Sequence, residues 1–394
     1  MATVVLLGTL DTKGREYAYL RDRLRERGVD VLLVDVGVND PQIEPDIARA
    51  EVASAEYGDR GAAVEAMARG AEAVVRRLHD EGRLDGILAL GGSGGTAIAT
   101  QAMRALPVGV PKLMVSTMAS GDTRPYVGAV DVTMTYSVVD IAGINAVSAR
   151  ILSNAAAAIA GMATAEPPDV ERGKPLVAAS MFGVTTPCVT AARERLEELG
   201  YEVLVFHATG TGGQSMEALM RGGFITAVLD VTTTELADDL VGGVLSAGPD
   251  RLEAAGELGL PQVVSLGALD MVNFGPRDSV PERFRDRLLY EHNPTVTLMR
   301  TTPEECAELG RRIARKLNAA TGPLTLFVPL RGVSMIAVEG QPFHDPEADS
   351  ALVGALRAEL DPGVDVRELD TDVNDPAFAE AMAERLHELV GERA

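Results

Sequence analysis

Short apolar runs rich in Val, Leu and Ile alternate with segments of helical period along almost the whole chain. This alternation is typical of parallel strands joined by crossover helices, because a parallel strand needs a long return connection and a helix supplies it. Helices cover both faces of such a sheet. The sequence therefore predicts an α/β fold with two Rossmann-like, doubly wound domains and mostly parallel sheets.

One polar segment, TAEPPDVERGKP at 164–175, interrupts the alternation and contains three prolines. We interpret it as the linker between an N-terminal nucleotide-binding domain, 1–168, and a C-terminal domain, 176–394. The expected strands are 3–8, 29–36, 86–90, 111–115, an edge strand within 128–137, and then 176–180, 202–207, 225–229, 262–265, 324–328 and 364–369. The expected helices include 14–27, 61–79, 94–105, 139–162, 187–199, 303–319, 346–360 and 375–391.

Charge and cysteine content exclude several classes of function. The formal net charge is −22 and the sequence lacks clusters of Lys and Arg, so we expect neither nucleic-acid nor membrane-surface binding. Two distant cysteines indicate no disulfide framework and no thiolate zinc site. We expect a cytoplasmic protein without a signal peptide or a transmembrane helix, and a buried helix where the apolar stretch 141–162 is interrupted by Arg150 and Asn154.

The segment LALGGSGGTAIAT, 88–100, has the order strand, glycine turn, helix that α/β proteins use to hold phosphate. Glycines let a backbone pass through positive φ and bring its N–H groups against an anion, and the following helix adds the positive end of its dipole. A close-packed turn is the alternative. The predicted phosphate contacts are Gly91, Gly92, Ser93, Gly94, Gly95 and Thr96.

A second loop, GTLDTKG at 8–14, joins the first expected strand to the first helix. Lys13 is a candidate for pairing with phosphate, Gly8 and Thr9 for nucleotide contact, and Asp11 for contact with Mg²⁺ or a ribose hydroxyl. The alternative is that Thr12 or Asp11 caps the helix. Both loops are expected at the carboxyl edge of one sheet, where open α/β sheets bind ligands.

Two further features of the first half are candidates for the same site. The loop VSTMASGDT, 115–123, offers Ser120 and Gly121 for the nucleotide and Asp122 for Mg²⁺, with a polar surface turn as the alternative. Asp35, at the end of the second expected strand, is placed to accept ribose hydroxyls, or else caps a helix.

The second half has its own glycine turn, HATGTGG at 207–213, again after a strand and before a helix. His207 is a candidate acid–base group, Asp230 follows the next strand, and Arg331 is suited to an anionic substrate. We expect His292, Asn293 and Arg300 in loops or strand-poor segments. The two halves align at 28–35 and 200–207, which either duplication or convergence explains.

Five segments together resemble one protein family: LLGTLDTKGREYAYLRDRL, LALGGSGGTAIAT, STMASGDT, HATGTGGQSMEAL and VPLRGVSMIAVEGQPFHDPEAD. This is the ATP-binding family of bacterial and plant proteins typified by the N-terminal domain of the tomato mosaic virus resistance protein. The resemblance implies two Rossmann-like subdomains, ATP binding and a homodimer. It carries the nucleotide role onto Gly8, Thr9, Lys13 and the residues 91–96.

The leading hypothesis is an ATP-binding protein with tentative Mg²⁺. One extension makes it an enzyme that acts on a small anionic metabolite in a cleft between the domains, with His207, Asp230 and Arg331 as its catalytic residues. The contrasting class is a nucleotide-gated binding or scaffold protein without turnover. NAD binding ranks lower, since the fingerprint G-x-G-x-x-G is absent.

Overall fold

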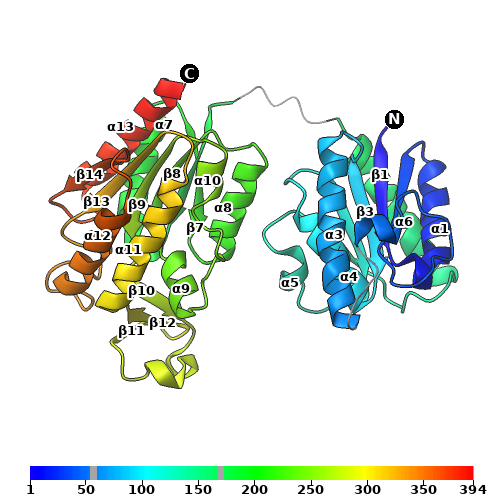
Figure 1. Cartoon of the computed structure of the whole chain (residues 1–394), viewed down its shortest axis with the longest axis horizontal. Coiled ribbons are helices and arrows are strands. Elements are labelled where there is room, and N and C mark those ends of the chain that lie inside the picture. The colour runs from blue at the N-terminus through cyan, green and yellow to red at the C-terminus, as the bar shows by residue number, and fades with distance from the viewer. Residues whose placement is uncertain (54–59, 167–172, 394) are drawn as a thin grey trace. The chain divides into compact units, whose positions relative to one another are not determined.

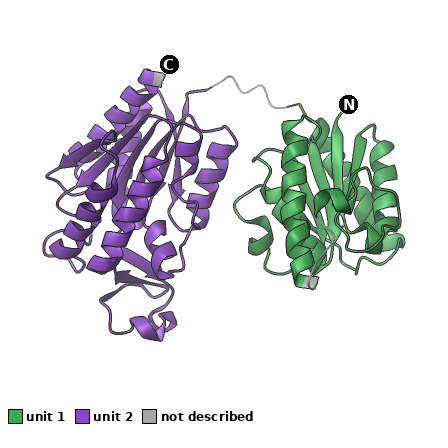
Figure 2. Cartoon of the chain, in the orientation of Figure 1, with its two compact units in different colours: residues 1–169 green, residues 170–394 purple. Residues whose placement is uncertain are grey.

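The computed structural model describes residues 1–53, 60–166 and 173–393. The chain divides into two compact units, Met1–Asp169 and Val170–Ala394 (Figures 1 and 2). The predicted linker, 164–175, includes residues 167–172, which lie outside the described residues. The α/β prediction is confirmed, because each unit contains an all-parallel sheet.

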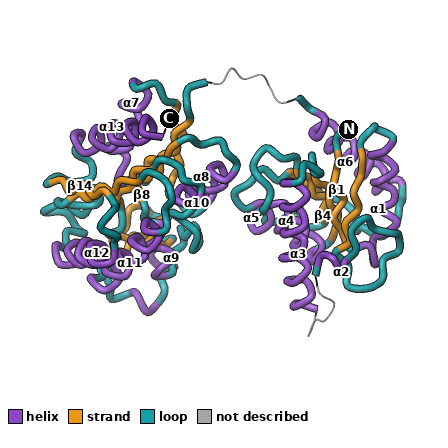
Figure 3. Tube along the Cα trace, turned by 45° about the horizontal axis from the view of Figure 1, so that its top comes forward, coloured by secondary structure: helices purple, strands orange, loops and turns teal. Residues whose placement is uncertain are grey.

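The first unit contains one parallel sheet with strand order β2-β1-β3-β4-β5. Its strands are β1 (Thr3–Gly8), β2 (Asp30–Asp35), β3 (Gly86–Gly91), β4 (Lys112–Ser116) and β5 (Thr133–Tyr136). Its helices are α1 (Leu10–Arg25), α2 (Arg49–Val52), α3 (Arg60–Asp80), α4 (Ser93–Arg104), α5 (Arg124–Val127) and α6 (Ala146–Thr164). Helices α1 and α6 cover one face of this sheet, and α3 and α4 cover the other (Figure 3). The fully buried side chains of β1 alternate between the two cores: Val4 and Leu6 pack with α1 and α6, whereas Val5 and Leu7 pack with α3 and α4.

The second unit repeats this strand order with one addition, β14-β13-β9-β8-β6-β7. These strands are β6 (Leu176–Met181), β7 (Glu202–His207), β8 (Ala227–Thr232), β9 (Gln262–Gly267), β13 (Leu324–Pro329) and β14 (Asp365–Leu369). Helices α7 (Thr186–Glu198) and α13 (Pro376–Arg393) cover one face. The other face carries α8 (Thr211–Arg221), α9 (Glu235–Val241), α10 (Ala254–Glu257), α11 (Pro303–Asn318) and α12 (Pro346–Glu359).

A small antiparallel sheet in the second unit was not predicted. Its order is β10-β12-β11, with strands β10 (Met271–Phe274), β11 (Leu289–Asn293) and β12 (Val296–Arg300). The expectation that His292, Asn293 and Arg300 lie outside strands is therefore wrong. They belong to β11 and β12, which are only five residues long and are too short to show a clear period.

Two helix boundaries differ from those expected. Helix α1 begins at Leu10 rather than at 14, with a non-helical residue at Lys13, and α6 begins at Ala146 rather than at 139. By length and composition, α6 is one helix of the described chain apolar enough to cross a membrane. Its Leu152, Ala156 and Ile159 are nevertheless buried in the core beneath the first sheet, as the sequence predicted for this segment.

Candidate functional site

The two loops singled out in the first half meet at one point of the sheet. The chain passes from β1 outward to β2 and then returns to the other side of β1 to form β3. The carboxyl ends of β1 and β3 are therefore neighbours at the place where the strand order reverses. In open α/β sheets of this order, ligands bind at that switch point.

The glycine loop after β3 presents free backbone donors. Gly92 is the N-cap of α4, and no side chain caps the helix. Within the described residues, the amides of Ser93, Gly94 and Gly95 have no hydrogen-bond acceptor. A Cβ added at Gly94 would meet no atom within 4 Å. The beginning of α4 is thus an open set of N–H groups at the positive end of a helix dipole.

The expectation that the glycines of this loop adopt positive φ is wrong, because none of its four glycines does so. What these positions need is the small size of glycine. Gly91 is required by packing, because a Cβ there would lie 3.0 Å from the Cα of Gly95. Thr96 is fully buried and its hydroxyl hydrogen-bonds Ser116 Oγ at 2.7 Å. Thr96 therefore joins the ends of β3 and β4, and the exposed hydroxyl of the loop is that of Ser93.

A buried tyrosine that the sequence reasoning missed joins the two loops. The hydroxyl of Tyr17 donates to the carbonyl of Leu7 at 2.6 Å and accepts from the amide of Leu90 at 2.9 Å. Burial raises the pKa of this phenol, so it remains a donor. A Cβ on Gly8 would lie 1.9 Å from the ring, which explains the glycine at the end of β1. The only local signal for this role is the position of Tyr17, about two turns into α1 and directly after the loop.

The loop after β1 directs its polar groups to different partners. Lys13 Nζ donates to the carbonyl of Ile141, which leaves two of its three N–H groups for a ligand. The hydroxyls of Thr9 and Thr12 lie 3.0 Å apart. Neither caps α1, so the capping alternative does not hold for Thr12 or for Asp11.

Two carboxylates of this region converge on Gly37. Asp35 is fully buried, and its Oδ1 accepts from the amides of Leu10 and Gly37 at 3.1 and 2.9 Å. A Cβ on Gly37 would lie 2.7 Å from Asp11 Oδ1 and 3.0 Å from Asp35 Oδ1. Asp11 Oδ1 and Asp35 Oδ2 have no hydrogen-bond partner among the described residues. Burial is the main cause that raises the pKa of Asp35, and Asp11 adds to it.

The predicted Mg²⁺ ligands do not meet. Asp122 forms an exposed two-point ion pair with Arg124, at 2.9 and 2.8 Å, and the guanidinium lowers the pKa of this carboxyl to about 2. Asp11 instead accepts from Asn39. Ser120 and Gly121 lie on the exposed turn before Asp122. In the described part of the chain, no group of three metal-ligating side chains could hold an ion by itself.

The second glycine turn, 207–213, is hydrogen-bonded to a carboxylate of the protein itself, that of Glu235. Glu235 Oε1 accepts from the amides of Gly210 and Gly213 at 2.7 and 3.0 Å. Glu235 is fully buried, and a Cβ on Gly213 would lie 2.1 Å from its Oε2. An internal carboxylate therefore occupies the space beside Gly210 and Gly213 at the beginning of α8.

The buried ion-pair network around Glu235 also contains Asp230. Arg251, fully buried, donates to Glu235 Oε2 at 2.7 Å and to Asp230 Oδ1 at 2.7 Å. Asp230 accepts in addition from Ser180 Oγ at 2.6 Å. Glu217 accepts from two backbone amides beside the same guanidinium. The network fills the switch point of the second sheet, between β6 and β8.

The three predicted catalytic residues are not brought together. His207 ends β7, an edge strand, and is exposed, whereas Asp230 is buried in β8. Arg331 follows β13 and pairs with Asp370 on the surface. Four strand spacings of about 4.8 Å separate β7 from β13, so about 19 Å lies between the strands that carry His207 and Arg331.

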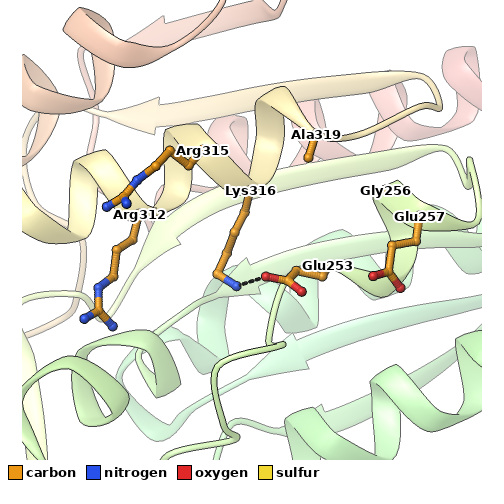
Figure 4. A pocket seen from close by; sticks show the side chains of 7 residues that line it. All are labelled: Glu253, Gly256, Glu257, Arg312, Arg315, Lys316 and Ala319. Atoms are coloured by element: carbon orange, nitrogen blue, oxygen red, sulfur yellow. Dashed lines mark hydrogen bonds and ion pairs between the residues drawn. The ribbon is translucent and has the colours of Figure 1, made fainter.

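A pocket of about 410 Å³ lies between α10 and α11, away from these loops (Figure 4). Its basic side chains already have acidic partners: Lys316 pairs with Glu253, and Arg312 with Asp239 at 3.2 Å. Because α10 immediately precedes β9, this pocket lies at the amino ends of the strands. It is at the opposite edge from the one where such sheets bind ligands.

The fold defines a two-domain α/β protein of the Rossmann-like class. The chain belongs to the uncharacterised protein family UPF0261, whose N-terminal domain matches residues 2–168 and whose C-terminal domain matches 174–390. The resemblance found in the sequence motifs is therefore confirmed.

Relatives match along almost the whole chain. A UPF0261 protein of Clostridium tetani is 54% identical over 97% of this chain and 98% of its own length. The tomato (Solanum lycopersicum) ToMV resistance protein Tm-1(GCR237) is 42% identical over 98% of this chain, which covers 55% of the tomato protein. The solved UDP-GlcNAc 2-epimerase of Neisseria meningitidis aligns over 100% of this chain and 99% of its own, at 10% identity and a TM-score of 0.26. A TM-score this low carries no argument about function.

Proposed function

We propose that the N-terminal domain binds ATP, with phosphate groups on the open amides of Ser93, Gly94 and Gly95. The observation that carries this proposal is the contrast between two glycine turns of similar sequence. At α8 the amides of Gly210 and Gly213 donate to Glu235, whereas at α4 the amides of Ser93, Gly94 and Gly95 have no acceptor among the described residues. Unpaired helix-terminal donors next to a switch point favour an anionic ligand.

The surrounding loop favours a nucleoside triphosphate over NAD. Lys13, in the loop after β1, keeps N–H groups that would supply positive charge to a phosphate, and the dinucleotide fingerprint is absent. Asp35 and Asp11 have unpartnered carboxylate oxygens that suit the ribose hydroxyls. Mg²⁺ would be bound mainly by the phosphates and water, with Asp11 or Asp122 as a protein ligand.

Calorimetric titration of the full chain with ATP and Mg²⁺ tests this proposal, and the variant Gly94→Val is the decisive one. A Cβ at position 94 meets no protein atom within 4 Å, so the valine side chain is expected to enter the space proposed for the phosphate with little effect on the fold. Gly161→Val, in α6, is a matched control because a Cβ there also meets nothing. We expect at least about a tenfold loss of ATP affinity in the first variant and none in the second. Failure to bind millimolar ATP, or equal binding by Gly94→Val, refutes the site.

A nucleotide-gated binding protein without turnover is the alternative to an enzyme, with a homodimer as its expected form. The dispersal of His207, Asp230 and Arg331 favours this alternative over chemistry at those three residues. Phosphate release in the presence of candidate metabolites distinguishes the two. Sedimentation with and without ATP measures the oligomer and its dependence on nucleotide.

A further inference from the structure

A second pocket, of about 260 Å³, lies in the C-terminal domain where β13 ends. It opens between the segment after β13 and helix α12, at the carboxyl edge of the parallel sheet. Its lining includes Arg331 but neither His207 nor Asp230. The pocket therefore gives Arg331 neighbours other than those predicted from the sequence.

Two arginines of this pocket hold carboxylates that a ligand can replace. Arg331 contacts both oxygens of Asp370, at 2.7 and 2.6 Å, with the two side chains 66% and 73% exposed. Arg357 contacts both oxygens of Glu368 in the same two-point manner. Exposed ion pairs contribute little stability, so exchanging one carboxylate for another costs little. The guanidinium geometry already matches a carboxylate.

The remaining walls combine an apolar floor with one titratable ring. Val333 and Leu352 are buried beneath the pocket, and Val353 lies beside them. His344 holds its Nδ1 3.2 Å from the carbonyl of Ala337, which leaves Nε2 for another partner. Asp349, the acidic side chain of the lining, is neutralised by the buried Arg300 at 2.7 Å. A bound anion therefore meets no uncompensated negative charge in the lining.

We infer that this pocket binds a small organic carboxylate with an apolar body, its carboxylate on Arg331 or Arg357 and its apolar part on Val333, Leu352 and Val353. This inference goes beyond the proposed function, because it gives the C-terminal domain a ligand class and a binding place of its own. It does not depend on ATP binding, since all its residues lie in the second unit. Such a ligand competes with Asp370 or Glu368 for the guanidinium because it gains additional binding free energy when its apolar body is removed from water.

Fluorine NMR with 4-fluorobenzoate as the probe tests the pocket in the full chain. For a ligand of this size we expect a dissociation constant on the order of 1 mM. The neutral analogue 4-fluorobenzyl alcohol tests the need for the carboxylate. The variants are Arg331→Gln, Arg357→Gln and the double variant. Arg285→Gln is the matched control, because Arg285 is 63% exposed, lies in the same unit and does not line the pocket.

The expected result is binding of the benzoate, weaker binding in each single variant, and at least about a tenfold loss in the double variant, with the control unchanged. Unfolding temperatures of all variants show that the domain remains folded. The inference is overturned by equal binding of the alcohol, by unchanged affinity in the double variant, or by no binding up to roughly 10 mM. Calorimetry with ATP on the same double variant is expected to be unchanged, so failure here is distinguishable from failure of the nucleotide site.

Discussion

Replacing Asp238 by Asn is expected to change how the stability of the C-terminal domain depends on pH. Asp238 is fully buried in α9, and its Oδ2 accepts from Asn273 Nδ2 at 2.7 Å. Burial raises the pKa of this carboxyl from the usual 3.8 to about 7. Asn273 Oδ1 has no partner among the described residues, so turning that amide gives an Asn at 238 a matching acceptor.

The direction of this pH dependence follows from which state of the protein, folded or unfolded, binds the proton of Asp238 more tightly. Because the pKa is higher in the folded state, the folded protein retains the proton of Asp238 at pH values where the unfolded chain has lost it. The stability due to this group is complete below about pH 4 and is lost as the pH rises to about 7. Since each pKa unit corresponds to 1.36 kcal/mol, the raised pKa of Asp238 corresponds to about 4 kcal/mol of unfolding free energy in total. Asn carries no titrating proton and avoids this loss.

Urea unfolding of the wild type and Asp238→Asn, followed by circular dichroism between about pH 4.5 and 8, measures the difference in unfolding free energy of this domain. Over this pH range we expect the difference to shift by about 3 kcal/mol in favour of Asn as the pH rises. Other titrating groups, such as Asp270 with its pKa raised to about 6 by burial, cancel in the difference. Asp278→Asn, at an exposed position, is the control. A difference that stays constant within about 0.5 kcal/mol refutes the reasoning.

Three further substitutions test the buried ion-pair network of the second domain and two glycine positions. Arg251→Leu leaves the buried carboxylates of Asp230, Glu235 and Glu217 without their cation. Urea unfolding is therefore expected to show a loss of about 3–5 kcal/mol in the free energy of unfolding. The loss is expected to be smaller at pH 5 than at pH 8, because carboxylates without a cation take up protons at the lower pH. Gly213→Ala places a Cβ 2.1 Å from Glu235 Oε2, and a lower melting temperature with a cost of about 1–3 kcal/mol is expected. Gly161→Ala, in an open helical position, is expected to stabilise by about 0.5–1 kcal/mol, and no gain in melting temperature would contradict this.

The central parallel strands, such as β1 and β3, could be predicted from the sequence because they are continuous apolar runs between helical segments. The small sheet of β10, β11 and β12 could not, since its strands pair antiparallel over four or five residues and no long period marks them. The start of α1 was also misplaced. Its first amide is capped from another strand, by Asp35 at the end of β2, and no local residue signals that partner.

Both glycine turns could be found in the sequence, because the order strand, glycine, helix is local. Their opposite states could not, since Glu235 reaches Gly213 from 22 residues further along the chain. In the first domain, Tyr17 joins Leu7 to Leu90 and brings the two loops to one edge, again across distant segments.

The amino-acid sequence was enough to predict the class of fold and the positions of both glycine turns, because hydrophobic periodicity and glycine spacing are local patterns. The tertiary structure was needed to show that Glu235 accepts from two amides of the second turn, and which residues surround Arg331. Both outcomes depend on charged side chains that come from distant parts of the chain, so no local pattern could indicate them.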